Sequence, residues 1–195
     1  METAPLPVNA EWLTLFDGKT LRGWVVTDFA GAGEAKTSNE KLILQMGDTL
    51  TGVTWTNGAL PTVDYEVSLE AMKIEGNDFF CALTFPVGES HCTWVIGGWG
   101  GGIVGLSSID GMDASENETS KSLYFERNRW FHLRLTVQRD HIRASIDQET
   151  VIDADIKGRK ISMRAGEIYK SQPFGFCTYQ TTAALRNIKL RRLSP

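Results

Sequence analysis

The chain has 195 residues, of which 42% are hydrophobic and 23% are charged, and 20 Lys and Arg against 24 Asp and Glu give a net charge of −4. This length is typical of one domain, and the composition excludes a disordered or fibrous protein. The weakly acidic balance disfavours a nucleic-acid-binding protein, and no apolar run reaches the roughly 18 residues of a membrane-spanning helix. We expect a flexible N-terminal arm over residues 1–10 and a single domain over residues 11–195.

From Glu11 onward, short apolar or alternating runs follow one another, separated by Gly, Asn and Asp. Many runs have the two-residue period of a strand, and no stretch keeps a helical period. The predicted strands, in chain order, cover residues 12–16, 23–26, 41–46, 52–56, 63–72, 79–85, 93–96, 103–107, 130–138, 141–146, 150–153, 174–179 and 186–191. Many short strands separated by turns indicate an all-β sandwich or barrel.

Turn sequences separate these runs. Asn57-Gly58 is a strong hairpin sequence, and Asp147-Gln148 is expected to turn a second hairpin. Residues 159–170 form a longer loop with several basic residues before the final pair of strands. Residues 100–105 match GxGxxG, but no helix is expected after them, so we interpret the glycines as a bend between strands. The alternative is a backbone that a ligand approaches, with Trp99 as its stacking surface.

Six tryptophans stand out in a chain of this size. Trp12, Trp24 and Trp130 lie where strands begin, and we expect them to anchor the core. The other three, Trp55, Trp94 and Trp99, are candidates for a sugar-stacking platform, because an aromatic ring pairs an apolar face with a polar edge.

The carboxylates and histidines give weaker indications. Glu66 and Glu70 share one face of a predicted strand, but they are about 13 Å apart, which is too far for a pair of catalytic carboxylates. His91 is next to Cys92, yet adjacent strand residues point to opposite faces, which argues against a Cys–His nucleophile. Three cysteines are too few for a disulfide framework, and no zinc-binding spacing exists. We expect no cofactor, with a divalent metal as the open alternative.

Residues 15–24, LFDGKTLRGW, resemble the N-terminal motif of the 3-keto-disaccharide hydrolase family. The resemblance continues through residues 64–70 (DYEVSLE), Gly76-Asn77 and Trp130, and it closes with residues 185–190 (LRNIKL). It covers the chain from Glu11 to Leu193. It implies a concanavalin A-like jelly roll of two antiparallel sheets with a carbohydrate site on the concave face. It also implies a bacterial protein that is exported to the periplasm or outside the cell. METAPLPVNA has no signal-peptide character, so the signal would be missing from this sequence, and a cytoplasmic protein is the alternative.

The chain departs from the family pattern at three places. Asn77-Asp78-Phe79 stands where the family has Asn-Ser-Gly. The strand that carries a Glu and a Gln in the family reads TWVIGGW at residues 93–99. The family's His-Gly before the last strand corresponds to residues 179–182, YQTT. The chain therefore resembles a divergent member.

The resemblance implies cleavage of a 3-keto-disaccharide or 3-keto-glucoside by elimination and addition of water. A base removes the C2 proton, which the 3-keto group acidifies, an acid protonates the leaving oxygen, and donors stabilise the enolate. Our candidates for the base are Glu70 and Asp78, and our candidate for the acid is His91. The candidates for substrate binding are Asn77 and Gln180 as hydrogen-bond donors and Trp94, Trp99 and Trp55 as stacking rings.

Two other functions stay open. A non-catalytic carbohydrate-binding module would have the same fold and tryptophans without a working acid and base, and the departures from the family pattern favour it. A structural or interaction domain is the third alternative. For the enzyme and for the binding module, the partner is a carbohydrate, which is neutral and needs no basic patch. We expect neither a nucleic-acid partner nor a membrane span.

Overall fold

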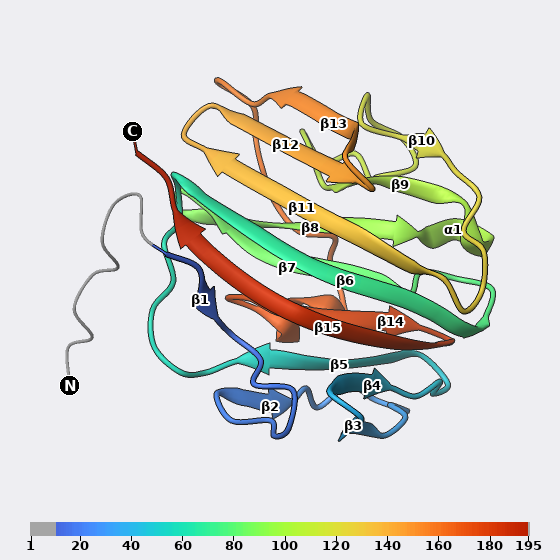
Figure 1. The fold of residues 1–195 in the computed structure, drawn as a ribbon. Coiled ribbons are helices and arrows are strands. Elements are labelled where there is room, and N and C mark those ends of the chain that lie inside the picture. The colour runs from blue at the N-terminus through green and yellow to red at the C-terminus, as the bar shows by residue number, and fades with distance from the viewer. Residues whose placement is uncertain (1–10, 195) are drawn as a thin grey trace.

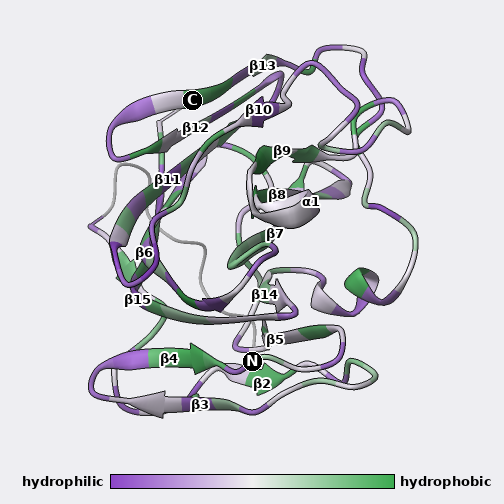
Figure 2. Ribbon diagram, turned by 90° about the vertical axis from the view of Figure 1, so that its right-hand side faces the viewer, coloured by the Kyte–Doolittle hydropathy of each residue, from purple (hydrophilic) through white to green (hydrophobic). Residues whose placement is uncertain are grey.

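A computed structural model describes residues 11–194 of the chain, so the expected arm over residues 1–10 lies outside the described residues. Within this range the chain forms two antiparallel sheets, one of eight strands and one of seven. The sheets pack face to face as a sandwich (Figures 1 and 2). The predicted all-β jelly-roll sandwich is confirmed.

The first sheet has the strand order β13-β12-β11-β6-β15-β4-β3, and β1 also pairs with β15. Its long central strands, β6 and β15, lie side by side in Figure 1. The bounds of its strands are β1 (Leu13–Thr14), β3 (Ala35–Ser38), β4 (Lys41–Leu44), β6 (Tyr65–Gly76), β11 (Trp130–Gln138), β12 (His141–Ile146), β13 (Glu149–Asp155) and β15 (Thr181–Arg192).

The second sheet has the strand order β10-β9-β8-β7-β14-β5-β2. A four-residue helical turn, α1 (Gly98–Gly101), joins β8 to β9, and a short 3-10 helix, η1 (Glu167–Ser171), precedes β14. The bounds of its strands are β2 (Trp24–Val26), β5 (Leu50–Trp55), β7 (Cys81–Val87), β8 (Ser90–Gly97), β9 (Ile103–Ser107), β10 (Lys121–Ser122) and β14 (Gly175–Tyr179).

Each predicted strand overlaps an observed one, and the short strands β3 and β10 were not predicted. The hairpin predicted at Asn57-Gly58 is wrong. β5 belongs to the second sheet and β6 to the first, so the segment between them crosses from one sheet to the other. Gly58 does adopt a positive φ of 92°, and its carbonyl accepts a hydrogen bond from the indole of Trp55. A turn therefore forms at Asn57-Gly58, but it does not pair β5 with β6, because the two strands are buried in different sheets.

Apolar side chains from the facing sides of the two sheets make the core. Alternate residues of β6 point inward, as the two-residue period predicts. Trp24 is buried as expected, and its indole donates a hydrogen bond to the carbonyl of Leu15 at 2.8 Å. Trp12 and Trp130 do not anchor the core. Their rings are covered by cations instead, Trp12 by Lys189 and Arg191 and Trp130 by an arginine from β15.

All three cysteines are free and buried. Burial raises the pKa of each thiol, that of Cys92 to about 12 and that of Cys177 to about 12. Cys81 shifts in the same direction. The thiols are therefore protonated at neutral pH and behave as small apolar side chains.

Candidate functional site

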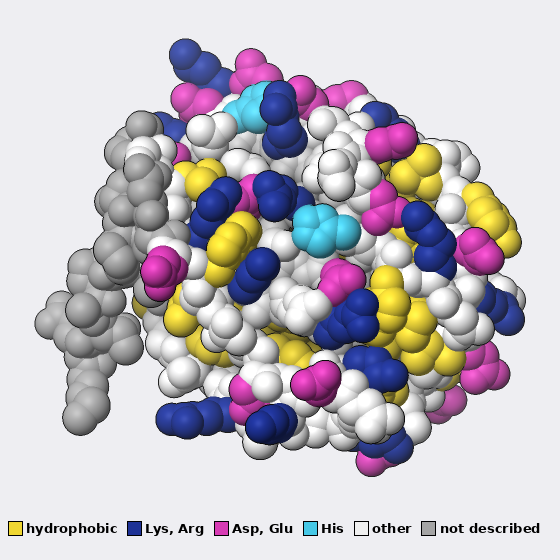
Figure 3. Space-filling model, in the orientation of Figure 1, with side chains coloured by type: hydrophobic (Ala, Val, Ile, Leu, Met, Phe, Trp, Pro, Cys, Tyr) yellow, Lys and Arg dark blue, Asp and Glu magenta, His cyan; other side chains and the backbone are white. Residues whose placement is uncertain are grey.

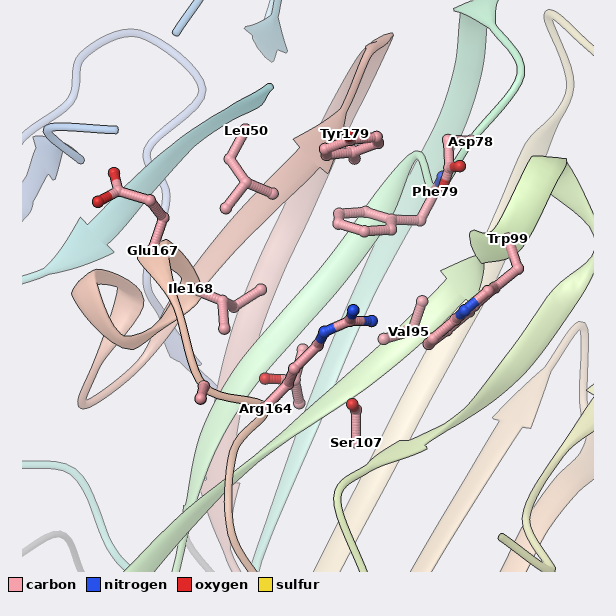
Figure 4. Close-up of a pocket in the computed structure, with 12 residues that line it drawn as sticks. Leu50, Asp78, Phe79, Val95, Trp99, Ser107, Arg164, Glu167, Ile168 and Tyr179 are labelled. Atoms are coloured by element: carbon pink, nitrogen blue, oxygen red, sulfur yellow. The ribbon is translucent and has the colours of Figure 1, made fainter. Parts of the chain in front are cut away.

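A cavity of about 400 Å³ lies on the outer face of the second sheet, between its strands and the segment that runs into η1. Figure 4 shows Arg164, Glu167 and Ile168 of this segment on one side, and Phe79 and Trp99 on the other. The cavity combines aromatic rings with a few polar groups, as small-molecule sites do.

The floor of the cavity is made of short side chains. In β8, Cys92, Trp94 and Ile96 belong to the core, so Thr93 and Val95 face outward. The same alternation directs Ala82 of β7 outward, where it packs in a small apolar cluster separate from the core. Short outward side chains leave space above the sheet for the segment and the cavity.

The segment that covers the floor is fixed by direct contacts with the sheet. The Oγ atom of Ser171 lies 2.6 Å from Oγ1 of Thr84, and both side chains are fully buried. A Cβ atom on Gly175 would lie 2.8 Å from the carbonyl oxygen of Ser171, so this position of β14 requires a glycine. The chain therefore reaches close to the sheet here and leaves the cavity beside the contact.

The aromatic walls come from the ends of strands. Trp99 lies in the α1 turn, where it adopts a left-handed backbone with φ 49° between glycines, and it remains 42% exposed. Gly97, with φ 82°, and Gly100, with φ 87°, make this tight turn accessible to the backbone. Opposite Trp99, the rings of Phe79 and Tyr179 pack with their centroids 5.9 Å apart. The cavity thus has aromatic surfaces on two sides.

The charged groups of the cavity are Arg164, Asp78 and Glu167. Asp78 accepts hydrogen bonds from the amides of Phe79 at 2.8 Å and Gly100 at 3.2 Å. The hydrogen bond from Lys170, followed by that from the amide of residue 30, lowers the pKa of the Glu167 carboxyl. Glu167 is therefore held ionised, which does not suit a general acid.

The structure brings four of the predicted site residues together. Asp78 and Trp99 line the cavity. Asn77 and Gln180 line a neighbouring hollow that shares Asp78 with the cavity. The amide of Gln180 donates to a carbonyl at residue 48, and the amide oxygen of Asn77 accepts from an arginine. These four side chains gather at one end of the sandwich.

Glu70 lies elsewhere, on the outer face of the first sheet, where charged side chains of both signs are interspersed (Figure 3). Its carboxylate accepts two hydrogen bonds from Arg186, each of 3.1 Å, and one from Asn187. The bonds from Arg186 are the largest cause of its lowered pKa, and the bond from Asn187 contributes further. The structure thus separates Glu70 from Asp78, and the sandwich core lies between them.

The other three predicted residues are not part of the cavity. Trp94 is 0% exposed and Trp55 is also buried in the core, so neither offers a ring face to a ligand and their prediction as stacking rings is wrong. Both sit at inward positions of their strands. His91 faces outward on β8, in line with Thr93, but it is not among the residues that line the cavity. Burial lowers the pKa of His91.

Arg164, Phe79 and Tyr179 were not predicted. Arg164 comes from a loop, and no sequence pattern indicates which sheet face a loop will cover. A signal did exist for the cavity floor, because outward positions such as Ala82 and Thr93 are unusually small or uncharged for a sheet face exposed to water. Such positions indicate that a further segment covers the sheet.

Among residues 11–194, no three His, Cys, Asp or Glu side chains converge into a group suited to a metal ion. In the same residues, neither helical segment has the length and apolar character of a membrane span.

Several solved structures share this fold at low sequence identity. A carbohydrate-binding module, CBM66 from Bacillus subtilis, is 16% identical, with a TM-score of 0.58 over 87% of this chain and 95% of that one. A protein of unknown function with a galectin-like fold, also from Bacillus subtilis, is 12% identical, with a TM-score of 0.63 over 88% and 90%. The Crh5 transglycosylase in complex with NAG is 11% identical, with a TM-score of 0.61 over 99% and 89%. These similarities support the concanavalin A-like sandwich.

No protein of curated function matches the chain in sequence. The family described as the 3-keto-alpha-glucoside-1,2-lyase-like domain matches residues 11–191, which is nearly all of the described part of the chain. The chain therefore belongs to the family of 3-keto-alpha-glucoside-1,2-lyase-like domains.

Proposed function

We propose that the chain binds a carbohydrate, without cleaving it, in the cavity between Trp99, Phe79 and Tyr179. The observation that supports this most is the exposed ring of Trp99, which a tight glycine turn presents to the cavity. Sugars carry apolar C–H faces that pack on aromatic rings, and their hydroxyls need a small number of polar partners. Asp78, Arg164 and the Ser107 hydroxyl supply such partners in the cavity.

The polar groups of the cavity favour binding over catalysis. Elimination at a 3-keto sugar requires a base for the C2 proton and a proton donor for the leaving oxygen. Of the two carboxylates that line the cavity, Glu167 is tied to Lys170 and to a backbone amide. The other candidates for the acid and the base, His91 and Glu70, lie outside the cavity.

The second candidate is a lyase or hydrolase of 3-keto-glucosides that uses Asp78 as its base. Family membership favours it, and so does the position of Asp78 at the cavity. Such an enzyme would need water or the substrate itself to protonate the leaving oxygen. Turnover distinguishes the two candidates. An enzyme would turn over a 3-keto-glucoside and lose that activity in Asp78→Asn, whereas a binding domain would show no turnover in either protein.

Calorimetric titration with maltose, trehalose, methyl glucosides and their 3-keto forms tests the proposal. We expect binding to at least one of them, and Trp99→Ala to weaken that binding at least tenfold. Trp12→Ala is the matched control, since Trp12 lies outside the cavity and its loss should leave affinity unchanged. The same sugars are then incubated with the protein, with and without a divalent metal. If the wild type forms product and Asp78→Asn does not, the non-catalytic binding function is rejected and the lyase or hydrolase is accepted.

A further inference from the structure

We propose a second site, an oxyanion site at the end of the sandwich next to α1, where Lys73 and Arg127 bind a carboxylate, sulfate or phosphate group. The site lies in a hollow of about 730 Å³ between the end of β6, the α1 turn and the segment before β11. Figure 1 shows these three parts of the chain meeting at one end of the molecule. The inference stands independently of sugar binding in the cavity.

The first observation is an inward-facing lysine without a partner. Along β6 the inward positions are Tyr65, Val67, Leu69 and Ala71, and the next inward position is Lys73. Lys73 is only 8% exposed, and within residues 11–194 its ammonium group forms no hydrogen bond or ion pair. Its stem lies on the core side of the strand and the residue lines the hollow, so its ammonium group is available there to an anion.

The second observation is another cation at the same place. Arg127 lines the hollow together with Lys73, and its Nη2 atom donates to the carbonyl oxygen of Gly76 at 3.1 Å and to Oδ1 of Asn77 at 2.9 Å. Both acceptors are neutral. Burial, and then the charge of Arg127, lower the pKa of Lys73. Two cations thus line one hollow, and among residues 11–194 neither forms an ion pair with a carboxylate, an arrangement that a bound anion stabilises.

The walls of the hollow suit an oxyanion. A Cβ atom on Gly100 would meet no atom within 4 Å, so this part of the turn is open to the hollow. Ser122 contributes a hydroxyl to the lining. The carboxylate in the lining is that of Glu126, which is exposed and forms no ion pair among the described residues. The two cations therefore outnumber it, and the hollow is positive in a chain whose net charge is −4.

The position of the site indicates where the anion could come from. Gly100 and Asn77 line both this hollow and the one that adjoins the cavity, and Gly100 directly follows Trp99. An acidic group on a sugar bound beside Trp99 is therefore one source of the anion. A free anion from solution would make the same contacts with the two cations, so the shared chemistry is that of an oxyanion.

NMR of protein labelled with ¹³C-lysine tests the site directly. The Lys73 ε-CH₂ signal is assigned with Lys73→Met, and the wild type is titrated with sodium sulfate, phosphate, glucuronate and, as the neutral comparison, glucose. We expect the three anions to shift the Lys73 signal saturably and to raise the pKa of its ammonium group, and glucose to do neither. Arg127→Gln should weaken the anion response at least tenfold.

Lys121→Met is the matched control, because Lys121 is an exposed lysine on β10 that does not line the hollow. It should leave the response of Lys73 unchanged. Tighter binding of glucuronate than of sulfate and phosphate, by tenfold or more, assigns the site to an acidic sugar, whereas equal binding assigns it to a free ion. The proposal is overturned if no anion moves the Lys73 signal, or if Arg127→Gln responds as the wild type does. Neither result depends on whether Trp99 binds a sugar.

Discussion

Arg164 and Asp113 form an ion pair, with Nη1 of Arg164 lying 3.1 Å from Oδ2 of Asp113. The guanidinium of Arg164 also lies 6.0 Å from the centre of the Trp99 ring. Asp113 in turn accepts a hydrogen bond from the hydroxyl of Ser107 at the end of β9. One carboxylate thus connects the covering segment to the second sheet and fixes the direction in which Arg164 points.

We predict that Asp113→Asn weakens ligand binding in the cavity about three- to tenfold while stability changes by less than about 1 kcal/mol. The amide can still accept from Ser107, but the loss of charge frees Arg164, and an ion pair with an exposed arginine contributes little to folding. Calorimetric titration and urea unfolding measure the two effects. Asp110→Asn is the control, because Asp110 pairs with Arg159 away from the cavity. Unchanged affinity in Asp113→Asn would show that the direction of Arg164 does not matter.

Asp78→Asn should loosen the turn that carries Trp99. The carboxylate of Asp78 accepts from the amides of Phe79 and Gly100, and an asparagine can satisfy only one of them with its oxygen. We expect about 1 kcal/mol of destabilisation and faster hydrogen exchange in residues 97–102. Asp64→Asn serves for comparison, since it removes a carboxylate next to the other end of β6, away from the α1 turn. Equal exchange in all three proteins would contradict the prediction.

Phe176→Ala should cost about 3–5 kcal/mol in the free energy of unfolding. The ring is fully buried, and its centroid lies 5.6 Å from those of both Trp24 and Phe174. Urea denaturation followed by circular dichroism measures the loss. Tyr169→Ala, which removes a half-exposed ring from η1, should change stability far less. A cost below about 1 kcal/mol for Phe176→Ala would mean that the core fills the space by relaxing.

Glu70 should make the stability depend on pH in acid. Its pKa in the folded state lies below the ordinary value of 4.5, because Arg186 and Asn187 donate to the carboxylate. The contribution to stability is therefore present above pH 4.5 and is lost as pH falls through the lowered pKa. The difference in unfolding free energy between wild type and Glu70→Gln should shrink between about pH 5 and pH 2. A difference that stays constant over that range would refute the role of the ionised carboxylate.

The strands were predictable because their pattern has a short period and depends on burial alone. Tyr65 and Val67 alternate with Glu66 and Ser68, and such a segment fits a half-buried strand and little else. The partners of each strand were not predictable. The same local turn at Asn57-Gly58 fits a hairpin or a crossing between sheets, and only the packing of distant segments distinguishes the two.

The site was predictable only in part, for a related reason. Trp94 and Trp99 both lie near the end of one hairpin, and both looked suitable for a sugar. Trp94 shares its strand face with Cys92 and Ile96 and is drawn into the core, whereas the glycine turn directs Trp99 outward. Where both faces of a strand carry uncharged residues, as in β8, the sequence does not say which face lies inside. Arg164 depends on the course of a loop, which no periodic pattern encodes.

Because all three thiols are buried, the folded protein has no native cysteine that a thiol reagent can reach. A thiol-specific dye should leave the native protein unlabelled and should react with three thiols after unfolding in urea. The native cysteines therefore report unfolding without any engineering. A single cysteine introduced at the exposed Tyr124 would be labelled alone, so that a fluorophore at the mouth of the Lys73 hollow could follow the arrival of a ligand.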